Sequence, residues 1–326
     1  MLAATGAVLG TGFVSTAVVA ESDWTVAQTP TTETLYDVEY TADDAFAVGA
    51  NGVALKRENG DWRTVVSDGP SGNGRDLFGT GVTDDGERLW FVGASGAVGE
   101  YDVSDGLLID QSDGVIDGSE PDDYTGNFRD VAVTGEENDA NVFVTDDSGI
   151  VHYSFDNGDT WDYVTPGSGS TIPAIDFYDT LAGHVSDTNQ TVSATSDGKS
   201  WSEAGIDNID ENLYGLDSDG PEDVWVCGNR GMVFEYDGSW GETTVGDVVL
   251  RDIDVTADDS DGYTVGSGGR VFRLGSGGWA EESTPTDEDL NGVVLDAPDS
   301  FDPGLLTDYF ADLAVGANGT IIEHQG

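Results

Sequence analysis

The chain has 326 residues, of which 37% are hydrophobic and 10% aromatic, and this composition suits a full hydrophobic core and excludes a disordered chain. It carries 64 acidic residues against 11 Lys plus Arg, a formal net charge of −53. Nucleic acids and anionic lipids both need positive patches, so we expect no nucleic-acid binding and at most peripheral membrane contact. The single cysteine, Cys227, excludes an intrachain disulfide and lies in the apolar stretch "VWVCGNRG", which favours a buried thiol.

The first segment in chain order, residues 1–20, reads "MLAATGAVLGTGFVSTAVVA" and contains no charge. The apolar run and the small residues Val18 and Ala20 predict the apolar region of a signal peptide, and the alternative is an uncleaved membrane anchor. The segment resembles a twin-arginine signal of a haloarchaeal secreted protein without its arginine end. The lysine-poor, evenly acidic chain likewise resembles proteins of halophilic archaea. The first resemblance implies a protein outside the cell or on its surface, and the second implies a salt-rich habitat.

The remainder, residues 21–326, reads as a set of repeats and is expected to form a single domain. In residues 34–66, "LYDVEY", "AFAVGA", "VALKRE" and "WRTVV" are strand-like segments joined by turns, so the unit predicts a four-stranded antiparallel sheet. Similar units occupy residues 77–105, 128–164, 172–204, 213–245, 250–282 and 290–324. A hairpin glycine with positive φ is expected between the second and third strands, at Gly52, Gly96, Gly149, Gly231, Gly269 and Gly319, with Asn189 or Gln190 in the fourth copy.

Seven copies about 40–50 residues apart predict an all-β, seven-bladed β-propeller, with a solenoid as the alternative. The seventh copy ends after its third strand, at "TIIEHQG". The missing fourth strand is expected in "SDWTVAQTP", residues 22–30. Trp24 would then take the place that Trp62 and Trp161 hold in other copies. The N-terminal strand would complete the last blade and leave no open edge at the seam.

The third copy contains "SFDNGDTW", which matches the Asp-box Ser-x-Asp-x-Gly-x-Thr-Trp in Ser154, Asp156, Gly158, Thr160 and Trp161. The fourth copy has a shortened version, "TSDGKSW". Together with "VGxxG" in several copies, the pattern resembles the WD40/YVTN/BNR-like propellers, including photosystem II assembly and stability factors and sialidase Asp-box propellers. We expect Asp156 to accept hydrogen bonds from its turn, Gly158 to adopt positive φ, and Trp161 to pack beneath the turn between blades.

No catalytic or metal site is predicted. The sialidase resemblance implies an arginine-bearing motif that the sequence lacks, yet the many carboxylates leave a carbohydrate-active propeller, either glycosidase or glycan-binding, as the alternative function. His152, His184 and His324 fall singly in different copies, without metal-ligand spacing. The acid-rich stretch "DQSDGVIDGSEPDD", residues 110–123, lacks the alternation of an EF-hand and favours a solvated loop over a calcium site. We expect no cofactor.

Binding is the remaining function. We expect a secreted or cell-surface, monomeric scaffold that binds an unknown protein or takes part in the assembly of an envelope complex, or that binds a glycan. Aligning the copies places one residue of each at the start of the innermost strand, at the mouth of the channel, and two further arginines at hairpin tips on the same face. Aromatic residues and arginine are enriched at interaction hot spots. The alternative is that these side chains fill the channel or pair with neighbouring acids such as Asp130 and Asp252. The candidate binding residues are Tyr36, Phe78, Arg129, Tyr214, Arg251 and Asn291, with Arg230 and Arg270.

Overall fold

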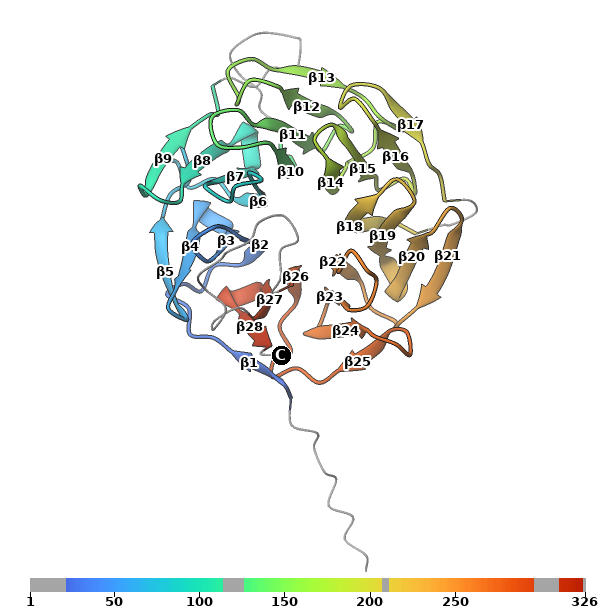
Figure 1. Cartoon of the computed structure of the whole chain (residues 1–326). Helices are drawn as coiled ribbons and strands as arrows, with labels where there is room; N and C mark the ends of the chain where they lie inside the picture. Colours follow the sequence, from blue (N-terminus) through green and yellow to red (C-terminus); the bar gives the residue numbers. More distant parts are fainter. Residues whose placement is uncertain (1–21, 114–125, 207–210, 296–310, 325–326) are drawn as a thin grey trace, which may run out of the picture.

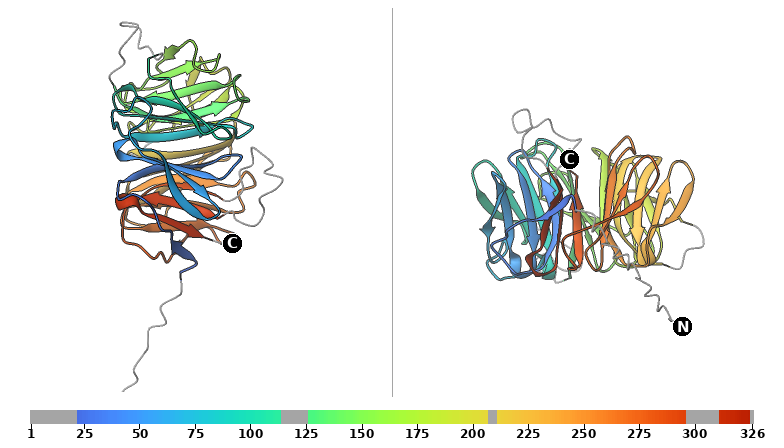
Figure 2. Two further views of the ribbon diagram at one scale, coloured as in Figure 1. Left: turned by 90° about the vertical axis from the view of Figure 1, so that its left-hand side faces the viewer. Right: turned by 90° about the horizontal axis from the view of Figure 1, so that it is seen from below.

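The computed structural model describes residues 22–113, 126–206, 211–295 and 311–324. These residues form seven four-stranded antiparallel sheets arranged as blades around a central axis (Figure 1). Figure 2 shows the ring edge-on, with the strands of each blade running between its two faces. The predicted seven-bladed β-propeller is confirmed. The apolar segment 1–20, most of the acid-rich stretch 110–123 and residues 296–310 of the seventh copy lie outside the described residues.

Each blade is numbered here by its copy in the sequence, and its strands are given from the innermost outward. Blade 1 contains β2 (Leu35–Tyr40), β3 (Ala45–Gly49), β4 (Ala54–Glu58) and β5 (Asp61–Val66). Blade 2 contains β6 (Leu77–Val82), β7 (Arg88–Gly93), β8 (Val98–Asp102) and β9 (Leu107–Asp110). Blade 3 contains β10 (Phe128–Thr134), β11 (Asn141–Asp146), β12 (Val151–Ser154) and β13 (Asp162–Val164).

Blade 4 contains β14 (Ala174–Asp179), β15 (Ala182–Ser186), β16 (Val192–Thr195) and β17 (Trp201–Glu203). Blade 5 contains β18 (Leu213–Gly220), β19 (Asp223–Gly228), β20 (Met232–Tyr236) and β21 (Trp240–Thr244). Blade 6 contains β22 (Leu250–Val255), β23 (Gly262–Gly266), β24 (Arg270–Leu274) and β25 (Ala280–Glu282). Blade 7 contains β26 (Leu290–Val294), β27 (Asp312–Gly316), β28 (Ile321–His324) and β1 (Trp24–Val26).

The last blade is completed by the N-terminal strand, as predicted. Strand β1 pairs antiparallel with β28, and Trp24 lies opposite His324. The Trp24 side chain is 2% exposed and packs in one cluster with Tyr263 of blade 6 and Ile322 of blade 7. Its indole N–H also donates a 2.8 Å hydrogen bond to Glu282. The strand therefore closes the ring by hydrogen bonds within blade 7 and by packing on blade 6.

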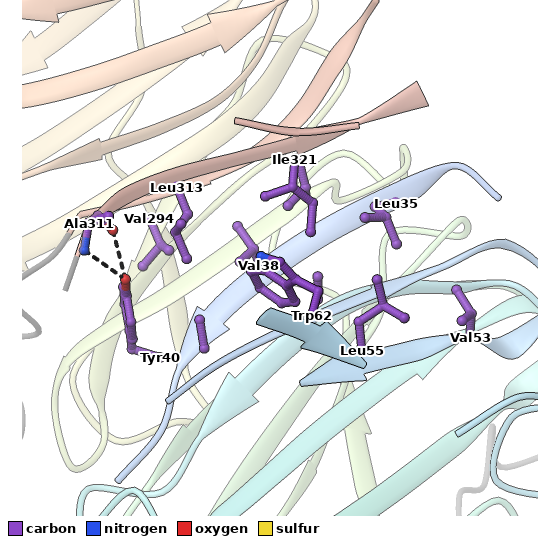
Figure 3. Packing of buried hydrophobic residues seen from close by; sticks show 13 residues of the cluster. Leu35, Val38, Tyr40, Val53, Leu55, Trp62, Val294, Ala311, Leu313 and Ile321 are labelled. Carbon is purple, nitrogen blue, oxygen red and sulfur yellow. Dashed lines mark hydrogen bonds between the residues drawn. The ribbon is translucent and has the colours of Figure 1, made fainter. Parts of the chain in front are cut away.

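The other side of blade 7 is joined to blade 1 by a continuous apolar cluster (Figure 3). Trp62 is buried there beside Leu313 and Ile321 of blade 7. The Tyr40 hydroxyl donates to the Ala311 carbonyl at 2.7 Å, and Figure 3 shows this bond at the end of the cluster. Blade 7 is thus fixed on both sides, so that the ring has no weakly packed seam among the described residues.

The hairpins between second and third strands adopt the left-handed backbone that their sequence requires. Asn51 and Gly52 have φ of 57° and 71°, and the first hydrogen bond of this turn runs from the Val53 N–H to the Ala50 carbonyl at 3.3 Å. A Cβ on Gly52 would lie 2.3 Å from the backbone nitrogen of Gly69. In blade 4 the left-handed residue is Gln190, at φ 71°, which decides between the two candidates left by the sequence.

Candidate functional site

The candidate site lies on the mouth face, which is the face where the innermost strands begin and the hairpins between second and third strands turn. In five blades the pairing register shifts across the second residue of the innermost strand. A β-bulge leaves its extra residue without a cross-strand partner and re-aims its side chain. The residues at these shifts are Tyr36, Phe78, Tyr214, Arg251 and Asn291. In blade 3 a wider shift includes Arg129, while in blade 4 the strand begins only after Pro173.

Three of these residues form a continuous stack, the mouth cluster, defined as Tyr36, Phe78 and Arg129. The rings of Tyr36 and Phe78 meet edge to face with centroids 5.1 Å apart. The Arg129 guanidinium lies over the Phe78 ring, 5.1 Å from its centroid. Each side chain is half-buried and comes from a different blade. The cluster therefore presents a rigid aromatic and cationic surface across blades 1, 2 and 3.

The arginines of the mouth face are paired with acids, but not with Asp130 and Asp252. Arg129 donates its Nε–H to Asp147 of the same blade. Arg251 donates from Nη2 to Asp289, at the entry to blade 7, at 3.1 Å. Both pairs are partly exposed to solvent. Each guanidinium has five N–H donors and a single carboxylate partner among the described residues, so both retain donors for a further anionic group.

The remaining predicted residues are spread around the same face. Asn291 donates to the Leu35 carbonyl at 2.8 Å and so links blade 7 to blade 1. The Tyr214 hydroxyl accepts a 3.4 Å hydrogen bond from Asn212. Arg230 lies in the hairpin of blade 5 and pairs with Glu211 at 2.7 Å. Arg270 opens β24 and pairs with Glu281 on the outer strand β25, at 2.6 Å, so its charge is directed outward along its own blade.

Beyond the mouth, a channel cavity of about 480 Å³ lies between the innermost strands, and Asp37 is one of the residues that line it. It is lined by many carboxylates, which the sequence reasoning did not single out. They are only partly exposed, and burial raises the pKa of Asp176 to about 6 and that of Asp254 to about 7. Burial also raises the pKa of five further carboxylates in the channel wall. This second set consists of Asp37, Glu39, Asp130, Asp217 and Asp252.

These carboxylates connect neighbouring blades through the backbone. One oxygen of Asp130 accepts from its own neighbour Val131, and the other accepts from Ile175 N–H of blade 4 at 2.9 Å. Asp176 reaches Ser218 N–H of blade 5 at 2.8 Å in the same way. The other bridges are Asp37 to Thr80, Asp217 to Val255, Asp252 to Val293 and Asp254 to Leu295. The acids beside the arginines are thus structural links between innermost strands.

The Asp-box of blade 3 forms a closed turn in the structure. The Asp156 carboxylate accepts from the Thr160 N–H at 2.8 Å and its hydroxyl at 2.6 Å, and these bonds lower the pKa of Asp156. Ser154 accepts from Gly158 N–H at 2.9 Å, and Gly158 has φ of 84°. Trp161 is buried in the cluster between blades 2 and 3. All of these groups bond or pack within the turn, as expected from the sequence, so the box closes its own turn.

The histidines and the cysteine are packed residues. His152 is fully buried 3.2 Å from Asp146, and His324 lies 3.0 Å from Asp312. His184 contacts the Ser218 hydroxyl at 2.7 Å, and burial lowers its pKa to about 4. Burial raises the pKa of the Cys227 thiol to about 12. Among the described residues, no group of three or more His, Cys, Asp and Glu side chains has the arrangement of a metal site.

Comparisons with known proteins place the fold but not the function. No protein-family model matches the chain, and no curated protein sequence does either. The structure is similar to YCF48 bound to a D1 peptide, at 15% identity and a TM-score of 0.69 over 94% of this chain and 96% of that one. It is also similar to the WD40 propeller domain of Doa1, at 12% identity and a TM-score of 0.68 over 93% and 97% of the two chains.

A third similar structure is virginiamycin B lyase from Staphylococcus aureus, with a TM-score of 0.71 at 13% identity over 92% of this chain and 97% of that chain. These identities establish the WD40/YCF48-like propeller architecture alone. One of these structures has a bound peptide and another is a lyase, so the shared architecture does not decide the function, which has to be argued from the site.

Proposed function

We propose that this chain is a non-catalytic binding scaffold that uses its mouth face to hold a protein partner outside the cell. The observation that carries the proposal is the mouth cluster, in which an arginine is stacked on an aromatic pair at three adjacent bulges. Such rigid, half-buried groups lose little conformational entropy on binding and are typical of hot spots. The partner would place an anionic group on Arg129 and an apolar group on Phe78.

The location of the protein is part of the proposal and rests on the sequence. The charge-free segment 1–20 and the acidic, lysine-poor composition support export and a salt-rich environment. No helix among the described residues is long and apolar enough to cross a membrane. At high salt the long-range attraction of the arginines is screened, so contacts within the mouth cluster would dominate binding.

The first test uses photo-crosslinking from the mouth face in the native host. We expect benzoylphenylalanine in place of Phe78 to crosslink a defined partner. The double substitution Arg129→Ala and Arg251→Ala should weaken capture about 10–30-fold, because hot-spot truncation costs about 1–2 kcal/mol or more. Its melting temperature should change little, because both arginine pairs are partly exposed.

The control places the same crosslinker at Tyr163, which is 42% exposed on the outer strand of blade 3. Equal crosslinking from both positions would show that the mouth face is not selective. A double variant that captures the partner normally but melts much lower would instead make the arginines structural counter-charges, and the mouth face would lose its role.

A carbohydrate-active propeller is the second candidate, and the channel carboxylates are the observation that favours it. Burial raises the pKa of Asp254 to about 7 and that of Asp176 to about 6, so near neutral pH Asp254 can hold the proton of a general acid while Asp176 is ionised. However, one oxygen of the Asp254 carboxylate accepts the Leu295 N–H of blade 7, which is the same bridging role that the other channel acids have. A glycan array and a hydrolysis assay in molar salt decide this, and turnover abolished by Asp254→Asn would replace the scaffold proposal.

A further inference from the structure

The outermost strand of blade 2, β9, is apolar and exposed, unlike most of the molecule's surface. Five large hydrophobic side chains are exposed among the described residues, and three of them are consecutive in β9. Leu107 is 58% exposed, and Leu108 and Ile109 are each 39% exposed. On a chain with a net charge of −53, such a grouping on one strand marks an interaction surface.

β9 differs from the outer strands of the other blades in the residue at its start rather than in its acids. An acid discourages edge pairing, and Asp110 stands at the end of β9 much as Asp61, Asp162 and Glu203 stand at an end of their own outer strands. Each blade except blade 2 has a tryptophan at or beside the start of its outer strand, as Trp24 and Trp62 show. Blade 2 has Leu107 there, and its only strand acid is the terminal Asp110.

Among the described residues no strand pairs with the outer edge of β9, which offers backbone groups as well as side chains. Gln111 N–H donates to the Val98 carbonyl of β8 at 3.0 Å, so Gln111 faces the blade. Backbone groups alternate in direction along a strand, and therefore Leu107 and Ile109 also face β8. The N–H and C=O groups of Leu108 and Asp110 then point away from the blade, where a further strand would pair.

Charge flanks this apolar edge at both ends. Asp105 is exposed in the turn before β9, and Asp110 and Asp113 are exposed at its end. A second copy of the chain would bring these acids against their own equivalents. A segment with an uncharged β-forming centre and a basic residue at each end would match both the apolar strand and its acidic flanks.

We propose that β9 is a docking edge that accepts an extended, β-forming segment of a partner protein with lysine or arginine at both ends. The segment adds a fifth strand to blade 2 through the outward groups of Leu108 and Asp110. β9 lies on the rim of the ring, whereas β2, β6 and β10, which carry the mouth cluster, are innermost strands beside the central channel (Figure 1). The proposal is therefore independent of the binding function assigned to the mouth face.

The experiment measures binding of a labelled seven-residue peptide of alternating valine and threonine with lysine at both ends. Fluorescence anisotropy would follow binding to the full chain in low and in molar salt. Leu108→Pro removes one outward N–H without removing a β8 bond, and Leu108→Thr is the matched control that keeps it. We expect Leu108→Pro to bind at least tenfold more weakly than Leu108→Thr. A glutamate-capped peptide should bind at least tenfold more weakly than the lysine-capped one at low salt, and this difference should shrink in molar salt.

Equal affinity of Leu108→Pro and Leu108→Thr would overturn the proposal, as would equal binding of the two peptides at low salt. If Leu108→Pro does not fold, the test uses the wild-type chain with a lysine-capped peptide that is N-methylated at every second residue, so that one edge of the peptide has no N–H donors. Undiminished binding of that peptide would contradict strand addition. Wild-type dimers in sedimentation velocity that are lost in Leu108→Thr, without peptide binding, would assign β9 to a second copy instead.

Discussion

Trp24→Ala is expected to destabilise the whole propeller by about 3–5 kcal/mol, as large-to-small substitutions of buried tryptophan do. The side chain is 2% exposed, and its ring meets Tyr263 edge to face at 5.2 Å. Its indole N–H is also bonded to Glu282 of the neighbouring blade. Because Trp24 holds the closing strand to blade 6, its loss should lower the urea concentration at the midpoint of unfolding while the transition stays single and cooperative. Urea unfolding in molar KCl measures this, since urea leaves the ionic strength unchanged.

The matched control is Val26→Ala on the same strand, where the side chain is 56% exposed and the expected change is below about 0.5 kcal/mol. Deletion of residues 22–30 should destabilise the protein further, because it also exposes the edge of β28. A deletion that melts like the full chain, or that releases one blade in a separate small transition, would contradict closure by the N-terminal strand.

The closure of the ring was predictable because two incomplete repeats fit each other. The seventh copy lacks a strand, and "SDWTVAQTP" supplies one with its tryptophan in the repeat position. Strand periodicity and hairpin glycines act locally, within one blade, so they can be read from the sequence. The same logic explains the one ambiguity, because Asn189 and Gln190 both tolerate a left-handed turn and only the three-dimensional register selects Gln190.

The links between innermost strands were not predicted, although the sequence holds a signal for them. Asp37, Asp130 and Asp252 occupy the third position of their innermost strands, and glycine takes that position in three other blades. A Cβ on Gly79 would lie 2.6 Å from the Asp130 Cα, and one on Gly215 would lie 2.7 Å from the Asp252 Cα. Asp on one strand and Gly on its neighbour at this position indicate that the two innermost strands lie close together. Comparing the repeats one at a time does not reveal this contact between blades.

The mouth cluster could be predicted only in part. Aligning the copies placed Tyr36, Phe78 and Arg129 at one end of the channel, since the start of each innermost strand is a repeat feature. Their mutual contact depends on bulges that turn three side chains toward one another across two blade junctions. The pairing of Arg129 with Asp147 depends on the same geometry. Side-chain contacts between blades depend on how neighbouring blades pack in the closed ring, and the repeat pattern describes only the structure within one blade.

The channel carboxylates should reverse the usual dependence of stability on pH. Burial raises their pKa in the folded protein, to about 6 for Asp176 and about 7 for Asp254, against about 3.9 in the unfolded chain. At pH values between the unfolded and the folded pKa, these carboxyl groups are protonated in the folded state and ionised in the unfolded state. The free energy of unfolding therefore falls as pH rises from about 4 to about 7. His184, whose pKa is lowered to about 4, acts in the opposite direction, but it is a single group.

We expect the free energy of unfolding to fall by on the order of 2–4 kcal/mol between pH 4.5 and pH 7.5. This corresponds to a combined shift of a few pKa units, discounted because solvent in the channel screens the carboxylates. Below pH 4 the trend should reverse, because acids such as Asp156 and Asp261, whose pKa is lowered by hydrogen bonds, lose them on protonation. The most stable condition should thus be mildly acidic, where the channel carboxyls are protonated and the outer acids remain ionised.

Urea unfolding at several pH values in constant molar KCl tests this dependence. The double variant Asp176→Asn and Asp254→Asn should flatten the slope between pH 4.5 and pH 7.5, because each asparagine keeps one acceptor oxygen for the bridging N–H of Ser218 or Leu295 but does not titrate. Asp258→Asn, at a solvent-exposed carboxylate, should leave the slope unchanged. A wild-type stability that rises steadily up to pH 7.5 would mean that the channel carboxylates are ionised throughout. The blade junctions would then be held by charged acceptors, and the low-dielectric channel would not govern the titration of the protein.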